Sequence, residues 1–212
     1  MAKGLIIIGG GEHARVVAEA ARSQLDFWLL NGFIDPEPCA SFERVLGIPR
    51  LGVDQDLIDR AQREGECWVV LGVGGVSPAN HRRKVVESYQ GAKLRWAAVI
   101  HSTAWVSPTA TVAEGVVVLA GATVNSGAVL GPHCVVNTGA IIEHDVMVGS
   151  FAMVSPGAAV GGGAVLEEDC FIGLGANVRD HVTVGRAATV GMGAAVVKSV
   201  AAGQMVAGVP AR

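Results

Sequence analysis

The second half of the chain repeats with a period of six residues, and this repeat constrains the fold more than any other feature. Every sixth residue from Val106 to Val190 is Val, Leu or Ile, and every sixth residue from Ala110 to Ala194 is Ala, Val or Cys. An α-helix and an ordinary β-strand have periods of about 3.6 and about 2 residues, so neither explains the pattern. A hexapeptide period is typical of a parallel β-helix, whose coils stack on one another. The sequence therefore predicts a β-helix in this half of the chain.

The hexapeptide pattern resembles that of the left-handed β-helix acyltransferases, in which three hexads form one triangular coil. The resemblance implies about five coils, with the large aliphatic residue inside the prism and the small residue at each corner. Cys134 and Cys170 stand at the small position, so we expect packing residues rather than reactive thiols. Residues eighteen apart then stack at about 4.8 Å, the spacing of neighbouring strands. This predicts one column formed by Ser126, His144, Gly162 and Asp180.

The first half of the chain alternates between short apolar runs and helical stretches. We expect strands over 5–8, 27–34, 67–73 and 94–99. We expect helices over 12–23, over 54–63 with Asp54 as N-cap, and from the pair Ser77-Pro78 to about residue 89. Such alternation predicts a small parallel sheet with right-handed crossovers. The expected fold is a Rossmann-like α/β half over 1–100, followed by a left-handed parallel β-helix over 101–212.

A glycine-rich loop follows the first expected strand. Residues 9–14, GGGEHA, fit the pattern G-x-G-x-x-[GA], and Asp35 lies 24 residues after Gly11. The N-terminus of a helix after such a loop favours an anion, so the loop predicts a nucleotide site. A purely structural tight turn is the alternative. An NAD site is disfavoured, because about 100 residues make only half of a two-lobed Rossmann domain.

Composition excludes several classes of protein. The apolar content of 50% excludes disorder, and a net charge of −3 gives no electrostatic reason to bind nucleic acid. No apolar run reaches about 18 residues, so we expect no membrane span, and the apolar N-terminal run is too short for a signal peptide. The four cysteines form no CxxC pair and no zinc spacing. We therefore expect reduced thiols, a cytoplasmic protein and no metal.

Five stretches together carry a closer resemblance to one family. They are GGGEHA at 9–14, FID at 33–35, IHSTAWVSP at 100–108, NTGAIIEHD at 137–145 and GVPAR at 208–212. Over essentially its whole length the chain resembles the sugar acetyltransferases of the sialic acid O-acetyltransferase and bacillosamine N-acetyltransferase group. The resemblance implies acetyl transfer from acetyl-CoA to a nucleotide-linked amino sugar in surface-glycan synthesis. Sialic acid O-acetylation is the alternative.

The same resemblance implies how the parts cooperate. The N-terminal domain would hold the nucleotide, and the β-helix would form a homotrimer with coenzyme A between neighbouring helices. Gly10, Gly11, His13 and Asp35 match positions on the nucleotide side. His101, at the junction of the two domains, is expected to be structural.

His144 is the expected general base. By motif it is the histidine of NTGAIIEHD, and it stands between the interior positions Ile142 and Val146, so its side chain should lie outside the core. The acceptor must lose a proton as it attacks the thioester, and imidazole titrates near neutral pH. Asp145 resembles the family's adjacent acid, which would orient the ring. An ordinary exposed histidine is the alternative.

Gly162 matches the family glycine whose N–H stabilises the oxyanion of the thioester and which also lies beside the coenzyme. The eighteen-residue spacing independently puts it one coil from His144 on the same face. Preorganised donors of this kind carry a large share of many catalysed rates. The alternative is that the three glycines at 161–163 only make a tight corner.

Further positions rest on the resemblance alone. Leu174 and Met192 match residues that line the coenzyme groove, with ordinary surface packing as the alternative. Asn137 matches a residue near the acceptor sugar, although an asparagine there would equally cap a turn.

Two residues depart from the family pattern. Met153 stands in the coenzyme site where relatives often carry a second histidine, so any donor to the acetyl carbonyl from that position is missing. Glu12 stands where many relatives have glycine, and a carboxylate beside a phosphate site is unfavourable. Either Glu12 points outward or the loop contacts the sugar instead.

Three other classes of protein fit the pattern less well. A γ-type carbonic anhydrase shares the β-helix but needs convergent histidines with one closely spaced pair, and this chain has no such pair. A non-catalytic binding protein would explain Met153, but the His144-Asp145 pair argues against it. An NAD-dependent enzyme is disfavoured by the short α/β half.

Overall fold

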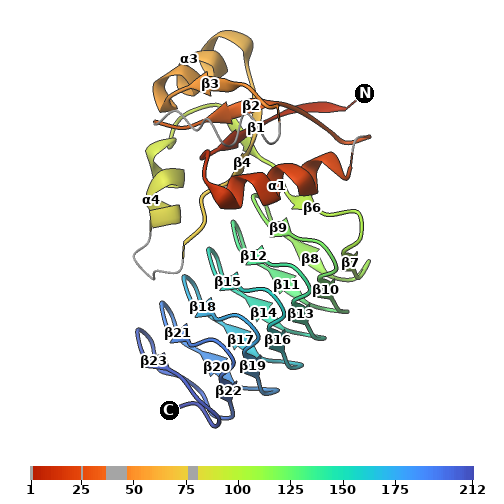
Figure 1. The fold of residues 1–212 in the computed structure, drawn as a ribbon, viewed down its shortest axis with the longest axis vertical. Coiled ribbons are helices and arrows are strands. Elements are labelled where there is room, and N and C mark those ends of the chain that lie inside the picture. The colour runs from red at the N-terminus through yellow and green to blue at the C-terminus, as the bar shows by residue number, and fades with distance from the viewer. Residues whose placement is uncertain (1, 25, 37–46, 76–80) are drawn as a thin grey trace. The chain divides into compact units, whose positions relative to one another are not determined.

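The computed structural model describes residues 2–24, 26–36, 47–75 and 81–212, which fall into two compact units. The first unit contains the described residues up to Ser102, and the second runs from Thr103 to Arg212. The first is a small α/β unit and the second a prism of short stacked strands (Figure 1). The expected fold class is therefore confirmed. The expected helix start at Ser77-Pro78 lies outside the described residues.

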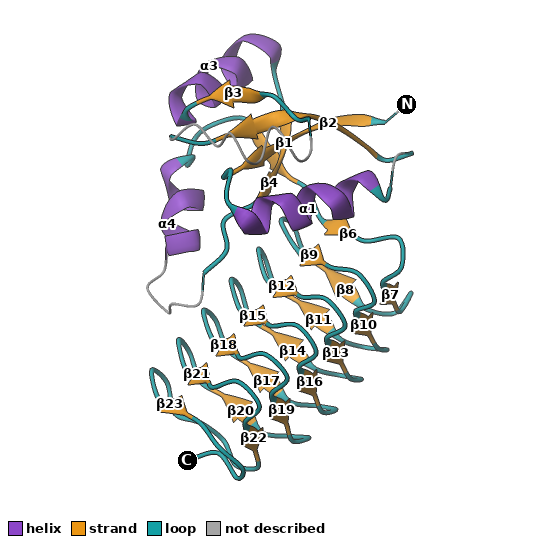
Figure 2. Ribbon diagram, viewed as in Figure 1, coloured by secondary structure: helices purple, strands orange, loops and turns teal. Residues whose placement is uncertain are grey.

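A five-stranded parallel sheet forms the first unit, in the order β3-β2-β1-β4-β5 (Figure 2). Its strands are β1 (Lys3–Ile8), β2 (Trp28–Ile34), β3 (Arg50–Gly52), β4 (Cys67–Leu71) and β5 (Leu94–Trp96). Its helices are α1 (Glu12–Arg22), α3 (Asp54–Glu64) and α4 (His81–Ser88), and the two-residue strand β6 (Val99–Ile100) follows β5. The apolar run of β1 is buried throughout Leu5–Ile8, as expected for a central parallel strand.

The start of α3 corrects the sequence prediction. The residue before the helix is Val53, so the expected N-cap at Asp54 is wrong by one position. Asp56, in the first turn, accepts the N–H of Val53 at 2.8 Å and satisfies this end of the helix in place of a capping side chain. Asp54 instead accepts the hydroxyl of Tyr89 at 2.5 Å, which ties the chain after α4 to α3.

The β-helix has three faces of parallel two-residue strands. The first face holds β7 (Trp105–Val106), β10 (Thr123–Val124), β13 (Ile141–Ile142), β16 (Ala159–Val160), β19 (Asn177–Val178) and β22 (Ala195–Val196). The second holds β8 (Thr111–Val112), β11 (Val129–Leu130), β14 (Met147–Val148), β17 (Val165–Leu166) and β20 (Thr183–Val184). The third holds β9 (Val117–Val118), β12 (Val135–Val136), β15 (Met153–Val154), β18 (Phe171–Ile172), β21 (Thr189–Val190) and β23 (Met205–Val206).

Strand pairing fixes the length of one coil. Thr123 pairs with Trp105 on one side and with Ile141 on the other, so neighbouring strands on a face are 18 residues apart. The second residue of almost every strand points inward, and Leu130, Ile142 and Ile172 are fully buried. These aliphatic side chains form the core of the prism, as the hexapeptide pattern predicts.

Cysteine replaces alanine at two of the small positions of this core. Cys134 and Cys170 are both buried thiols. Burial, followed by the nearby Asp169, raises the pKa of Cys170 to about 12, so this thiol stays protonated and unreactive at neutral pH. The prediction that both are packing residues agrees with this burial.

Corners that join the same two faces of the prism stack into an edge, which takes its name from those two faces. The first–second edge contains residues 125–128, 143–146, 161–164 and 179–182, and the third–first edge contains 119–122, 137–140, 155–158, 173–176 and 191–194. One residue of each of these corners takes the left-handed backbone conformation, as at Gly127 (φ 70°), Asp145 (φ 58°) and Gly163 (φ 64°). Glycine suits that position because it has no Cβ to clash with the backbone.

The predicted column of Ser126, His144, Gly162 and Asp180 is present along the first–second edge. The Asp145 N–H donates to the carbonyl of Ser126 at 2.9 Å, and the Gly163 N–H donates to the carbonyl of His144 at 2.9 Å. Each corner is thus hydrogen-bonded to the one before it in the stack. Among the described residues, no helix combines the length and the apolar character needed to cross a membrane.

Candidate active site

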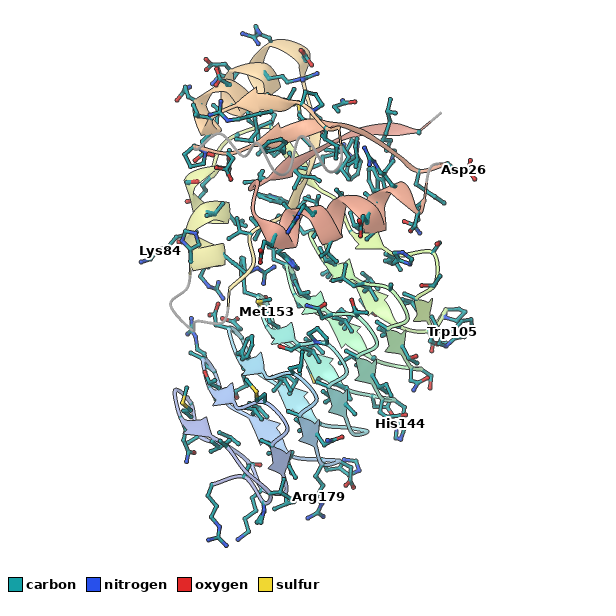
Figure 3. All side chains as sticks on the ribbon, viewed as in Figure 1. Asp26, Lys84, Trp105, His144, Met153 and Arg179 are labelled. Atoms are coloured by element: carbon teal, nitrogen blue, oxygen red, sulfur yellow. The ribbon has the colours of Figure 1, made fainter. Side chains whose placement is uncertain are left out.

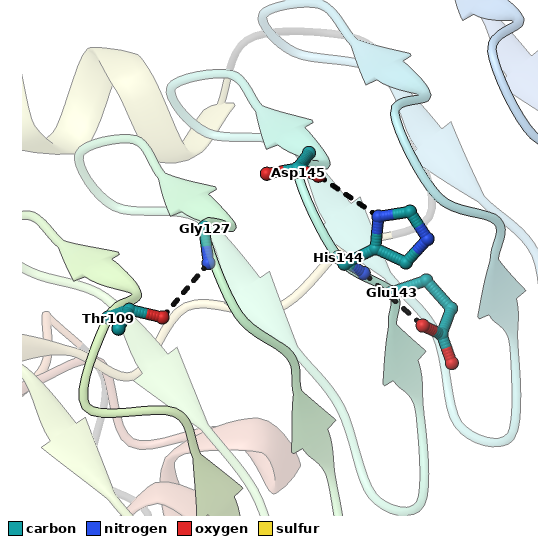
Figure 4. A network of polar contacts seen from close by, with 5 residues as sticks. All are labelled: Thr109, Gly127, Glu143, His144 and Asp145. Carbon is teal, nitrogen blue, oxygen red and sulfur yellow. Dashed lines mark hydrogen bonds and ion pairs between the residues drawn. The ribbon is translucent and has the colours of Figure 1, made fainter.

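His144 and Asp145 form a hydrogen-bonded pair on the outside of the first–second edge. The His144 side chain is 57% exposed, and its Nδ1 lies 3.0 Å from Oδ2 of Asp145 (Figure 4). A carboxylate can only accept, so the proton of the neutral ring belongs on Nδ1. That leaves the lone pair on Nε2, which is the arrangement of an oriented general base.

The local backbone explains why the pair forms. Asp145 occupies the left-handed position of its corner, which aspartate tolerates better than most residues with a Cβ. Its own N–H is held by the carbonyl of Ser126. The N–H of His144 donates to the carboxylate of Glu143 at 3.2 Å (Figure 4). Both residues of the pair are therefore anchored through their main chain.

The ring of His144 lies against Gly162, one coil further along. A Cβ added to Gly162 would stand 2.6 Å from both Cε1 and Nε2 of the ring. The left-handed residue of this corner is Gly163, not Gly162, so the need for a tight turn does not by itself explain the glycine at 162. In the part of the chain that the structure describes, the Gly162 N–H donates to no protein acceptor. That donor therefore remains available to a ligand.

The residues expected to line the coenzyme groove lie elsewhere on the prism. Leu174 and Met192 are on the third–first edge, 56% and 78% exposed, and Met153 is on the third face. His144 and Met153 project from different sides of the β-helix (Figure 3). One copy of the chain therefore does not bring these residues to His144.

Asn137 also lies on the third–first edge. Its side-chain carbonyl accepts the N–H of Thr138 at 2.8 Å, so it caps its own turn in this structure. Capping a turn is the structural alternative that the sequence left open for Asn137. The bond from Thr138 uses only Oδ1, so the amide nitrogen of Asn137 takes no part in it.

In the first unit, a cavity of about 710 Å³ opens beside the glycine loop. Its lining includes Gly10, Gly11, His13 and Asp35, so the structure brings all four expected nucleotide-side residues together. Oδ2 of Asp35 accepts the N–H of Gly10 at 2.5 Å, which braces the loop against the end of β2. A Cβ at Gly10 would meet the ring of Phe33 at 2.8 Å, so the loop requires glycine there.

His13 and Glu12 differ sharply in their surroundings. Burial, followed by the charge of Arg82, lowers the pKa of His13 to about 4, so the ring is neutral at pH 7. Its Nε2 is buried and, among the described residues, has no hydrogen-bond partner. The Glu12 side chain is 95% exposed and lies 3.8 Å from Arg15. Of the two outcomes left open for Glu12, the structure shows the outward-pointing one.

Two further residues that the sequence does not predict as site residues, Asp54 and His81, line this cavity. The sequence predicts Asp54 only as a helix cap. Ligands of open α/β sheets bind at the carboxyl ends of the strands, and Asp54 follows the end of β3. The sequence does not predict β3, so it carries no signal for this role of Asp54. Within the described residues, no group of three His, Cys, Asp or Glu side chains is arranged to hold a metal ion.

The chain is similar to known sugar acetyltransferases in both sequence and structure. The family model of the PglD N-terminal domain matches residues 4–89. The acetyltransferase domain of PglB from Neisseria gonorrhoeae FA1090, solved in complex with acetyl coenzyme A, is 34% identical, with a TM-score of 0.89 over 100% of this chain and 99% of that chain. No sequence among the curated proteins matches the chain significantly.

A second similar structure is PerB from Caulobacter crescentus in complex with CoA and GDP-perosamine. It is 30% identical, with a TM-score of 0.78 over 99% of this chain and 96% of that chain. A histidine-to-asparagine mutant of perosamine N-acetyltransferase from the same organism, also with CoA and GDP-perosamine, is 29% identical, with a TM-score of 0.73 over 99% and 95%. The resemblance inferred from the sequence is confirmed, and the chain belongs to the hexapeptide-repeat sugar N-acetyltransferases, which use acetyl-CoA.

Proposed function

We propose that this protein transfers the acetyl group of acetyl-CoA to the amino group of a nucleotide-linked amino sugar. The observation that carries the proposal is the His144–Asp145 pair stacked against Gly162 on an exposed edge. The ligands named for the similar structures, acetyl coenzyme A for PglB and CoA with GDP-perosamine for PerB, support the same pair of substrates.

The chemistry follows from the arrangement of the pair. Nε2 of His144 removes a proton from the acceptor amine as its nitrogen attacks the thioester carbonyl. Asp145 keeps the Nδ1–H tautomer and stabilises the imidazolium that forms. The Gly162 N–H donates to the oxyanion. The C–S bond then breaks, the thiolate of CoA leaves and takes the proton from the imidazolium of His144, and the new amide remains on the sugar.

The coenzyme lies along the apolar residues Leu174, Met192 and Met153. Because these lie away from the first–second edge of their own chain, His144 meets them only across an interface with another copy. The proposal is therefore a homotrimer with one acetyl-CoA site between each pair of neighbouring copies. Asn137, near those residues, contacts the sugar through its amide nitrogen.

The domain over 1–100 holds the nucleotide, and the domain over 101–212 carries out the transfer. The carboxylate of Asp35 and the neutral ring of His13 both line the cavity beside the glycine loop. A carboxylate repels phosphate but accepts well from ribose hydroxyls, so Asp35 faces the ribose and Gly11 faces the phosphates. The enzyme works in the cytoplasm and supplies acetylated sugars for surface glycans.

The test is thiol release from acetyl-CoA with a panel of UDP-, dTDP- and GDP-linked amino sugars and with sialic acid. Turnover with at least one nucleotide-linked amino sugar, lost in His144→Ala, is the expected result. Turnover with sialic acid alone would overturn the proposal in favour of O-acetylation. Light scattering on the same sample tests the trimer, for which a mass of three chains is expected.

A further inference from the structure

Gly127 lies one coil before Asp145 on the first–second edge, and the two residues share the left-handed backbone conformation, with φ of 70° and 58°. A Cβ added to Gly127 would overlap Oδ1 of Asp145 and would lie 3.4 Å from its Cγ. The carboxylate of Asp145 thus occupies the space that a side chain at residue 127 would fill. Figure 4 shows Gly127 beside the His144–Asp145 pair.

The two oxygens of this carboxylate have different neighbours. Oδ2 lies 3.0 Å from Nδ1 of His144, and Oδ1 faces Gly127. A carboxylate is planar and rigid, so a displacement of Oδ1 moves Oδ2 as well. A side chain at residue 127 would therefore disturb the hydrogen bond to the ring without touching His144.

The backbone of Gly127 is held in place, so the carboxylate is the part that must move. The N–H of Gly127 donates to Oγ1 of Thr109 at 3.2 Å (Figure 4). The carbonyl of the preceding residue, Ser126, accepts the N–H of Asp145 at 2.9 Å. The Asp145 side chain is 73% exposed and has room to swing toward solvent.

We propose that Gly127 is a positioning residue for the His144–Asp145 pair. Because Gly127 has no side chain, the carboxylate of Asp145 can occupy the space in which its Oδ2 is aligned with Nδ1 of His144. This inference rests on the proposed function, in which Asp145 orients the general base. It gives Gly127 a role beyond that of an ordinary corner glycine.

The chain contains a closely matched control at Gly121. Its φ is 66°, and its N–H donates to Oγ1 of Thr103 at 3.2 Å, as the N–H of Gly127 does to Thr109. Among the described residues, no heavy atom lies within 4 Å of a Cβ built on Gly121. Gly121→Ala therefore has the same backbone cost as Gly127→Ala but displaces no side chain.

The kinetic test compares four variants of the full chain in the acetyl-transfer assay: Gly127→Ala, Gly121→Ala, Asp145→Ala and the Gly127→Ala/Asp145→Ala pair. We expect kcat to fall about tenfold or more in Gly127→Ala, a part of the 10²–10⁴-fold that a general base contributes, with KM for acetyl-CoA unchanged. Gly121→Ala should stay near wild type. In the Asp145→Ala background, Gly127→Ala should cause no further loss.

A spectroscopic test needs no substrate. The ¹⁵N chemical shifts of the His144 ring report whether Nδ1 or Nε2 carries the proton. We expect the Nδ1–H form to dominate in wild type and in Gly121→Ala, and to lose that dominance in both Gly127→Ala and Asp145→Ala.

The two tests separate the possible failures. Wild-type tautomer and kcat in Gly127→Ala, beside an impaired Asp145→Ala, would overturn the positioning role of Gly127 alone. An unchanged tautomer in Asp145→Ala would overturn it too, because the carboxylate would then not orient the ring. Absence of acetyl transfer to any nucleotide-linked amino sugar would overturn the proposed function, while the tautomer result would still decide the role of Gly127.

Discussion

The ring of His144 lies so close to the α-carbon of Gly162 that a methyl group at residue 162 would stand 2.6 Å from Nε2. The two residues are 18 apart in the chain and meet because successive coils stack in register. Gly162 is therefore needed less for its backbone freedom than for the space that the imidazole occupies.

Gly162→Ala should lower kcat by about tenfold or more, because the new methyl group displaces the ring whose Nε2 acts as base. Stability should change little, since residue 162 does not have a left-handed backbone and the ring is free to swing into solvent. Alanine keeps the backbone N–H, so the oxyanion donor is retained. Steady-state kinetics and a thermal melt measure the two effects, and unaltered kcat would contradict the steric argument.

His144→Ala should lower kcat by about 10²–10⁴-fold and leave the affinity for coenzyme A nearly unchanged, because the imidazole transfers a proton and does not anchor the coenzyme. His181 is a suitable control, since it lies on the same edge and is exposed. His181→Ala should keep wild-type kcat. Near-wild-type turnover in His144→Ala would remove this residue from the mechanism.

The buried His13 should make the first unit sensitive to acid. Its pKa is lowered from 6.5 to about 4 by burial and by Arg82, so between these values the unfolded chain binds a proton that the folded chain does not. Stability should therefore fall as the pH drops from about 6.5 to 4, by about 3 kcal/mol from this residue.

Urea unfolding at pH 7 and at pH 4.5 measures this dependence, with His13→Gln as the comparison because glutamine does not titrate. The variant should lose less stability between the two pH values than wild type does. An identical loss in both proteins would show that His13 does not couple folding to protons.

Cys134 and Cys170 should not react with a thiol reagent such as Ellman's reagent in the native protein, because both are buried and Cys170 has its pKa raised to about 12. Both should react after unfolding in urea. Mass mapping of the labelled peptides identifies each cysteine separately. Native labelling of Cys170 at the rate of a free thiol would contradict its packing role.

The fold can be predicted from the sequence where a residue pattern is compatible with only one kind of structure. The hexapeptide period predicts both the buried aliphatic column and the 18-residue stacking, and the structure contains both. The sequence does not predict the strand Arg50–Gly52, because three residues with an arginine and a glycine carry no apolar signal. The predicted cap at Asp54 is wrong, because Asp56 accepts the N–H of Val53 from inside the first turn of the helix.

The site could be predicted only in part, for reasons of geometry. The stacking of His144 on Gly162 follows from the 18-residue length of one coil. The position of the Asp145 carboxylate beside Gly127 depends instead on where a residue with a left-handed backbone directs its side chain. The sequence grouped Leu174, Met192 and Met153 with His144, but the edge or face that each occupies follows only from the course of the coil. That these residues meet His144 across an interface between two copies of the chain stays a prediction.

N-acetylation is tested most directly by identifying the bond that holds the acetyl group in the product. Acetyl-CoA labelled with ¹³C at the carbonyl is incubated with the enzyme and the preferred nucleotide sugar, and the product is treated with hydroxylamine and followed by NMR and mass spectrometry. We expect one labelled acetyl group held as an amide, which hydroxylamine leaves in place. A labelled ester that hydroxylamine removes, or labelled free acetate with the sugar unchanged, would contradict N-acetylation by this protein.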